Sequence, residues 1–126
     1  MANTSIDLEA TLAQALHGLG WVAYGGELPA KFEQRGLPAV RVIELPGRET
    51  ARAWNGPGLL HERDVDIDVF DTDADKLADA TARLRADLET FRTEQVAVTS
   101  VPAFTRRPDW NDKVRRRGAV LSLVTR

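Results

Sequence analysis

The segment from Asp64 to Leu88, DVDIDVFDTDADKLADATARLRADL, is the feature that most restricts how this chain can fold. Its first half alternates strictly, with apolar residues at 65, 67 and 69 and aspartates at 64, 66 and 68, which is the pattern of a half-buried β-strand. From Leu77 onward the apolar residues recur at helical spacing and predict an amphipathic helix. We expect Thr72 to cap this helix, with Asp75 completing a capping box. The helix must then pack its apolar stripe back onto the sheet that contains the strand.

The rest of the chain supplies the other elements of one α+β domain that spans residues 1–126. We expect a first helix over 5–17 and further strands over 21–24, 39–45, 59–70, 95–104 and 114–125. The connections between strands suggest no crossover, so we expect a mainly antiparallel sheet of about four to five strands. Two helices should pack on one face of this sheet, in the order α-β-β-β-α-β-β. The segment 46–58 is long for a loop in a compact domain, and such loops are often functional.

The last predicted strand differs from the third because its apolar residues do not alternate. Residues 119–121 and 123–124 are apolar and therefore occupy both faces of the strand. Such a strand needs apolar cover on both sides. Helices would supply one cover, and we expect another subunit to supply the second, with Leu121 and Leu123 at the contact.

The composition and the motifs exclude several kinds of chemistry. The chain has no cysteine, so it has no thiol nucleophile, no thiolate zinc site and no disulfide. Neither histidine lies in HxH or HExxH spacing, and the chain contains no GxSxG, Walker or GxGxxG motif. The N-terminal residues lack a signal-peptide pattern, and no apolar run is long enough to span a membrane. We therefore expect a soluble intracellular or assembled protein that is not an enzyme and uses no metal or cofactor.

Charge is distributed unevenly along the chain, although the net charge is only −2. Residues 60–90 contain ten acidic and four basic residues, whereas residues 106–126 contain seven basic and two acidic ones. Such asymmetry can indicate an end of the chain that binds nucleic acid. It can equally indicate acidic and basic surfaces that meet, either within one subunit or between neighbours.

The aspartates at 64, 66 and 68 are the one place where this sequence could hold a cation. Carboxylates on a strand can ligate magnesium, as in nucleases and phosphoryl-transfer enzymes. The alternative is an ion-paired strand face, with Arg41 or the late arginines opposite the aspartates. We favour the ion-paired face.

The segment 106–117, RRPDWNDKVRRR, interleaves basic residues with Trp110 and is the best candidate for contact with nucleic acid. Its three consecutive arginines must split between the faces of a strand, so we do not expect them to form one patch. Contact with the acidic strand of a neighbouring subunit is the favoured alternative, because arginine and aromatic residues are common at interface hot spots. The candidate contact residues outside the apolar part of the last strand are Arg48, Arg52, Trp54, Arg106, Arg107, Trp110, Arg115 and Arg117.

Two of these segments, DVDIDVFDTDADKLADATARLRADLE and RRPDWNDKVRRRGAVLSLVTR, resemble the tail terminator proteins of long-tailed bacteriophages, also called tail completion or minor tail proteins. The N-terminal helix and the RVIEL strand also fit this family. The resemblance implies a structural virion protein with no catalytic residues. Such proteins form a ring, commonly a hexamer, that ends the tail tube, stops its polymerisation and presents a surface to the head.

The resemblance also implies partners and a location. The partners would be other copies of the chain, the major tail tube protein and the head–tail connector protein, with no membrane involved. The protein would be made in the host cytoplasm and would end at the head-proximal end of the tail in the virion. DNA would pass through the ring without specific binding, which favours an acidic or neutral lining. The face with Asp64, Asp66 and Asp68 is therefore a candidate for the lumen or for a subunit interface.

Other functions remain open at the level of the sequence. Within the same class, the chain could be a connector or stopper protein of the phage neck. From other classes, it could be a small metal nuclease that uses the aspartates, or a nucleic-acid-binding module.

Overall fold

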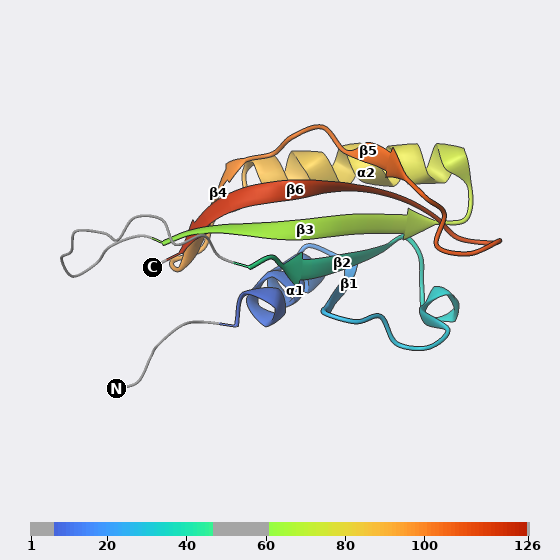
Figure 1. The fold of residues 1–126 in the computed structure, drawn as a ribbon, viewed down its shortest axis with the longest axis horizontal. Coiled ribbons are helices and arrows are strands. Elements are labelled where there is room, and N and C mark those ends of the chain that lie inside the picture. Colours follow the sequence, from blue (N-terminus) through green and yellow to red (C-terminus); the bar gives the residue numbers. More distant parts are fainter. Residues whose placement is uncertain (1–6, 47–60, 126) are drawn as a thin grey trace.

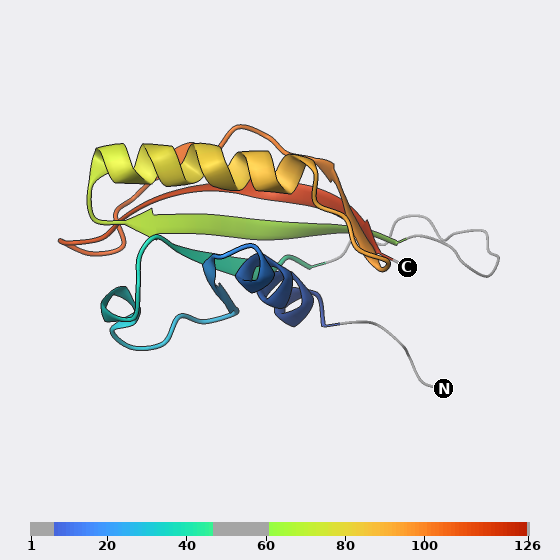
Figure 2. The same ribbon diagram turned by 180° about the vertical axis from the view of Figure 1, so that it is seen from behind.

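The computed structural model describes residues 7–46 and 61–125, which form two layers (Figure 1). One layer is a six-stranded mixed sheet, and the other consists of helices α1 (Leu8–Gly18) and α2 (Ala74–Glu89). Figure 2 shows both helices in front of the same face of the sheet. The predicted α+β class is therefore confirmed. None of the described helices is both long enough and apolar enough to cross a membrane.

The six strands lie in an order that differs from their order in the sequence. They are β1 (Val22–Gly25), β2 (Ala39–Glu44), β3 (His61–Asp71), β4 (Val96–Ser100), β5 (Thr105–Arg107) and β6 (Arg115–Thr125). The spatial order is β1-β2-β3-β6-β4, and β5 also pairs with β6. The long strands β3 and β6 are paired along their whole length and form the centre of the sheet.

One strand pair departs from the antiparallel arrangement that the sequence predicts. Strands β1 and β2 are parallel, with Val22 opposite Ala39, whereas the other pairs are antiparallel. A parallel pair needs a crossover of about a dozen residues or more. The segment between β1 and β2 is long enough for this, and it contains the short 3₁₀ helix η1 (Phe32–Gln34).

The segment expected as one strand over 95–104 forms only the short strand β4. Its pairing with β6 shifts register between Val98 and Ser100, and Pro102 follows, which cannot donate a backbone hydrogen bond. Strand β5 lies between the strands expected over 95–104 and 114–125, where the sequence predicted no strand. It is ordered by pairing with β6, which is a contact that local sequence does not specify.

The central strands separate their side chains as the alternating pattern predicts. Val65, Ile67 and Val69 of β3 are buried beneath the helices, so Asp64, Asp66 and Asp68 point to the opposite face. On β6, Leu121 and Leu123 also point to the helices and are 0% and 1% exposed. The expectation that these two leucines lie at a subunit contact is therefore wrong, because α2 already covers them.

The main core lies between the sheet and the two helices. Its helical contribution is Leu8, Leu12, Ala13, Leu16, Leu77, Ala80, Leu84 and Leu88. Trp21 links the two helices, since its indole Nε1 donates a hydrogen bond of 2.8 Å to the carboxylate of Asp87 on α2. The guanidinium of Arg83 stacks on the same ring, 4.0 Å from its centroid. This contact fixes the region after α1 against α2.

A smaller core covers one end of the opposite face of the sheet. Phe32 of η1 packs edge-on against Phe70 of β3, with ring centroids 5.2 Å apart. Ala39 and Val114 complete this buried cluster. The segments around η1 and Val114 therefore close one end of a face that carries no α-helix in the described part of the chain.

Helix α2 begins one residue later than the sequence suggests. Its N-cap is Asp73, whose carboxylate accepts hydrogen bonds from the backbone N–H of Asp75 at 2.7 Å and of Lys76 at 3.4 Å. Thr72 was expected in this role. Strand β3 continues to Asp71, whose carboxylate accepts from the backbone N–H of Thr72 at 2.7 Å, so the chain turns into the helix only at Asp73. Helix α1 is capped by Asp7 in the same manner.

The position of this cap gives a direct test. Asp73→Ala should lower the free energy of unfolding by about 1 kcal/mol, because it removes the acceptor for two helix N–H groups. Thr72→Ala should change it by less than about 0.5 kcal/mol, because Thr72 is exposed and is not the cap. Urea denaturation followed by circular dichroism measures both. A larger loss for Thr72→Ala than for Asp73→Ala would contradict the assignment.

Candidate functional site

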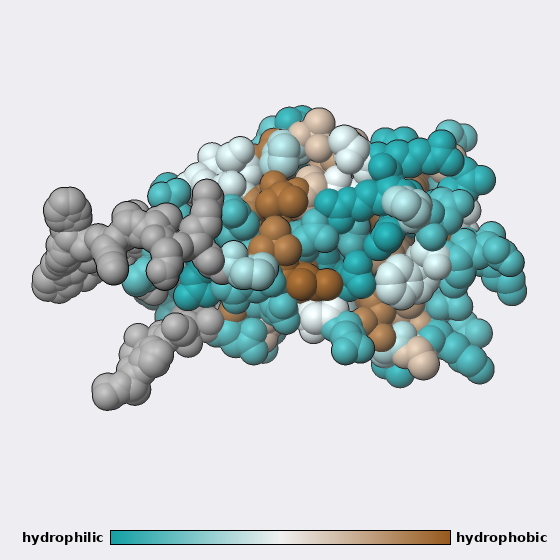
Figure 3. Space-filling model, in the orientation of Figure 1, coloured by the Kyte–Doolittle hydropathy of each residue, from teal (hydrophilic) through white to brown (hydrophobic). Residues whose placement is uncertain are grey.

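The face of the sheet opposite α1 and α2, which we call the open face, holds the strongest cluster of interacting side chains. It carries residues 41 and 43 of β2, residues 64, 66, 68 and 70 of β3, and residues 116, 118, 120, 122 and 124 of β6. Figure 3 views this face and shows hydrophobic side chains gathered near its middle, with hydrophilic ones on either side. Val120, at 43% exposed, is the most accessible large apolar side chain on the described part of this face.

A network of arginines and aspartates crosses the open face. The carboxylate of Asp68 is 1% exposed and accepts from Arg41 at 2.7 Å and from Arg107 at 2.9 Å. Arg107 also reaches Asp66 through two hydrogen bonds of 2.7 and 3.0 Å, which is a bidentate contact. Arg116 lies 3.7 Å from Asp68. The interpretation of the aspartates as an ion-paired strand face, with Arg41 and the late arginines opposite, is therefore confirmed.

The contacts of Arg107 in this network favour its protonated, charged form. Its hydrogen bond to Asp66 raises its pKa above the ordinary arginine value, against the opposing effect of burial, and the charge of Asp68 adds to the rise. Because the pKa in the folded state is raised, the resulting stabilisation is complete at neutral pH. It is lost only when the pH rises through this elevated pKa, far above the physiological range.

Trp110 is the exposed aromatic residue of this region and is held by arginines and by other rings. The guanidinium carbons of Arg41 and Arg116 lie 5.2 and 5.6 Å from the centroid of its ring, within the range of cation–π attraction. The ring also packs edge-on against Phe32 and Phe70 at 6.1 and 5.6 Å. Trp110 nevertheless remains 40% exposed. It is therefore a rigidly placed aromatic side chain at the protein surface.

Gly118 makes room for the network of arginines and aspartates, and this glycine was not among the residues predicted from the sequence. It lies opposite Asp68 in the sheet. A Cβ atom at this position would stand 2.5 Å from both the guanidinium carbon of Arg107 and Oδ1 of Asp68. A glycine inside a predicted strand can mark such a close approach, and that signal was present at position 118.

The structure separates the predicted contact residues into several groups. Arg48, Arg52 and Trp54 lie outside the described residues. Arg107 and Trp110 belong to the open face, whereas Arg106, Arg115 and Arg117 line a small pocket on the helix side of the sheet. Leu121 and Leu123 lie in the core.

The open face is not the acidic surface that the aspartates alone suggest. Asp66 and Asp68 are engaged by arginines, and Asp64 accepts a hydrogen bond of 3.2 Å from the hydroxyl of Ser122. The described residues contain no group of three or more histidine or acidic side chains that could hold a metal ion. A cation between Asp66 and Asp68 would have to displace the guanidinium of Arg107. The expected acidic lining therefore becomes a surface of mixed and largely paired charge.

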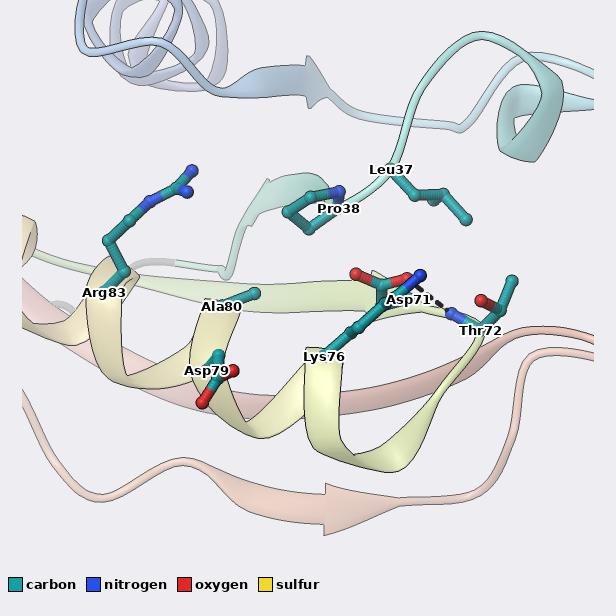
Figure 4. A pocket seen from close by; sticks show the side chains of 8 residues that line it. All are labelled: Leu37, Pro38, Asp71, Thr72, Lys76, Asp79, Ala80 and Arg83. Carbon is teal, nitrogen blue, oxygen red and sulfur yellow. Dashed lines mark hydrogen bonds between the residues drawn. The ribbon is translucent and has the colours of Figure 1, made fainter.

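A larger cavity of about 450 Å³ lies on the helix side, between α2 and the residues just before β2 (Figure 4). Figure 4 shows Asp71 and Lys76 pointing toward Pro38, while Asp79 points away. The carboxylate of Asp71 already accepts from the backbone N–H of Thr72. This cavity thus lacks a pair of converging free carboxylates of the kind used in acid–base catalysis.

Comparisons with known proteins inform the fold. No family model matches the sequence, and no curated protein sequence is significantly similar to it. The chain is similar to a solved protein structure with a TM-score of 0.53 and 13% sequence identity. The similarity covers 94% of this chain and 90% of that one. At this identity the likeness concerns the fold alone, and it extends over nearly the whole domain.

Gly118→Ala should disturb the network. The added methyl group would push Arg107 and Asp68 apart, and we expect a loss of about 1–3 kcal/mol in the free energy of unfolding. Gly18→Ala is the matched control, because a Cβ at this helical position meets nothing within 4 Å. The control should be neutral or stabilising by up to about 1 kcal/mol. Equal effects of the two variants in chemical denaturation would contradict the role of Gly118.

Arg107→Met should be destabilising because it leaves Asp68 buried with fewer cationic partners. We expect a loss of about 1–3 kcal/mol in the free energy of unfolding. This is less than the full cost of breaking a deeply buried ion pair, because the Arg107 side chain is 24% exposed. Arg85→Met is the control, since Arg85 and Glu89 form an exposed pair at 4.0 Å. That change should cost less than about 0.5 kcal/mol. Thermal denaturation of both variants measures how much stability each one loses. A loss for Arg107→Met as small as that for Arg85→Met would refute the prediction.

Proposed function

We propose that this chain is a tail terminator, a structural protein that forms a ring on the end of a phage tail tube. In this role it stops tube polymerisation, provides the surface that joins the tail to the head–tail connector, and catalyses no reaction. Its partners are other copies of itself, the tail tube protein and the connector protein. DNA passes through the ring without specific binding. The protein resides at the head-proximal end of the tail in the virion, after synthesis in the host cytoplasm.

The location of the two segments that resemble this family supports the proposal. One segment forms β3 and α2, and the other forms the end of β5 and the whole of β6. Strand β6 pairs with β3 from Asp71 opposite Arg115 to His61 opposite Thr125, and α2 packs on both strands. The resemblance therefore concerns one continuous structural unit at the centre of the domain.

The observation that carries the proposal is the exposed apolar surface on the open face. Both described α-helices cover the other face, and Val120 remains 43% exposed at the centre of a six-stranded sheet. Half-buried Ile43 and Val124 lie on the same face. An apolar centre bordered by arginines and a tryptophan has the composition of a protein interface. This supports an assembling protein, with the open face as one of the two different surfaces that a cyclic ring requires.

The nuclease interpretation receives less support from the same face. A carboxylate-based metal site needs free oxygens to surround the ion. The oxygens of Asp66 and Asp68 are instead occupied by Arg41 and Arg107 at hydrogen-bonding distance.

Removal of this gene from the phage genome that encodes it tests the proposal. Particles should then carry tails of irregular and excessive length that are not attached to heads, because nothing ends the growth of the tube. Electron microscopy measures the tail lengths. Tails of normal length without heads would point to a connector or stopper protein. Intact particles of normal morphology would contradict every structural role in the neck.

The role of the open face can be tested by complementing the gene deletion with variants of the chain. Val120→Asp places a charge in the exposed apolar patch and should fail to restore normal tails. By light scattering we expect the purified parent chain to form a ring and the purified variant not to form one. Gln14→Asp, on the exposed side of α1, is the matched control and should restore them. Full rescue by Val120→Asp would show that the open face is not an assembly surface.

A further inference from the structure

A second group of arginines gathers on the helix side of the sheet. Arg106 of β5 lies directly opposite Arg117 of β6, and Arg115 lies two residues along the same strand and therefore on the same face. These side chains line a pocket of about 70 Å³ between β5, β6 and the start of α2. The full lining of this pocket, which we call the arginine pocket, is Ala74, Leu77, Arg106, Asp109, Arg115, Arg116 and Arg117.

The two faces of the β5–β6 pair differ in how their charges are balanced. On the open face, Arg107 lies opposite Arg116, and the carboxylates of Asp66 and Asp68 neutralise this pair. On the helix side, Arg106 and Arg117 form an equivalent pair of like charges. Within residues 7–46 and 61–125, no carboxylate forms an ion pair with Arg106, Arg115 or Arg117. Like charges directly opposite each other in a sheet are destabilising unless something compensates them.

The other groups in the arginine pocket leave this imbalance in place. Asp109 is the one acidic residue of the lining, and Asp71 lies opposite Arg115 in the sheet, but among the described residues neither forms an ion pair with the three arginines. Leu77 contributes an apolar wall to the pocket. The first N–H groups of α2 do not add to the site, because Asp73 already accepts hydrogen bonds from Asp75 and Lys76. The arginines therefore dominate the electrostatics of the pocket.

We propose that the arginine pocket binds a phosphate group. Guanidinium groups present planar, paired donors that match the oxygens of phosphate, and several arginines can share one multiply charged anion. The volume of about 70 Å³ exceeds the roughly 10–15 Å³ that one water molecule needs, so the pocket has room for a small oxyanion. The phosphate group is either free inorganic phosphate or one phosphodiester of a nucleic acid whose remainder lies outside the pocket. The pocket shares Arg116 alone with the open-face network, and the proposal does not depend on the proposed ring.

The expectation that the three consecutive arginines split between the two faces of the strand, and so do not form one patch, is confirmed. Arg116 does turn to the open face, as strand alternation requires. Arg115 and Arg117 stay together on the other face, and β5 adds Arg106 beside them. The group of arginines on the helix side therefore arises because β6 pairs with β5, a strand that was not predicted from the sequence.

Calorimetric titration of the purified chain with sodium phosphate, at constant ionic strength balanced with chloride, tests the proposal. We expect saturable binding of one phosphate per chain. The double variant Arg106→Gln/Arg117→Gln should bind at least about tenfold more weakly, because it removes two charged donors. Arg85→Gln, an exposed arginine of α2 outside the pocket, should bind as the parent does. Heat that does not saturate, or equal binding by the double variant, would overturn the proposal.

Thermal unfolding separates ligand binding from damage to the fold. In chloride alone the double variant should unfold no earlier than the parent, because it removes the repulsion between Arg106 and Arg117. Phosphate should raise the midpoint of the parent and leave that of the double variant unchanged. Should the double variant fail to fold, the exposed Arg115→Gln replaces it and should weaken phosphate binding about threefold or more. An equal phosphate shift in parent and variant would also refute the site.

A DNA duplex of about 20 base pairs, followed by fluorescence anisotropy at low salt, distinguishes the two sources of phosphate. Binding that phosphate displaces and that the double variant loses would identify the backbone of a nucleic acid as the source. Saturable phosphate binding without any binding of the duplex would identify free phosphate. Duplex binding that neither phosphate nor the double variant affects would contradict a phosphate site in this pocket.

Discussion

The ion-paired carboxylate of Asp68 is the interaction on which the open face depends. It is almost fully buried on the central strand, and an unpaired buried carboxylate would be strongly unfavourable. Its cationic neighbours come from three other strands, namely Arg41 of β2, Arg107 of β5 and Arg116 of β6. One residue thus links four strands of the sheet. Strand β5 has only three residues. Besides its pairing with β6, the ion pairs of Arg107 help to fix its position.

The same network decides what the open face can do. By occupying the aspartate oxygens, the arginines remove the acidic surface and leave a paired, largely neutral one. By stacking on Trp110, Arg41 and Arg116 hold an exposed aromatic ring in one place. A fixed aromatic residue on the same face as exposed Val120 suits a surface that contacts other proteins, because little conformational entropy is lost on binding.

The pairing of β5 with β6 gives the two faces of the domain different electrostatic characters. Each face receives one pair of directly opposed arginines. Asp64, Asp66 and Asp68 of β3 point to the open face, and only Asp71 at its end lies on the helix side, since alternate side chains of a strand point in opposite directions. The arginine pair on the helix side is therefore left without an equivalent partner in the described chain. The paired charges of the open face and the arginine pocket are two consequences of one strand register.

The sequence by itself determined the α+β class, both helices, the central strands and the direction in which the aspartates of β3 point, because hydrophobic periodicity is a local property. It also pointed to Arg41 and the late arginines as their partners. Only the tertiary structure decided that β1 and β2 are parallel, that β5 exists, that Leu121 and Leu123 belong to the core, and that Gly118 admits Arg107. Each of these depends on which segments distant in sequence lie side by side. Residue periodicity reports which face of a strand is buried, but it carries no information about the neighbour that buries it.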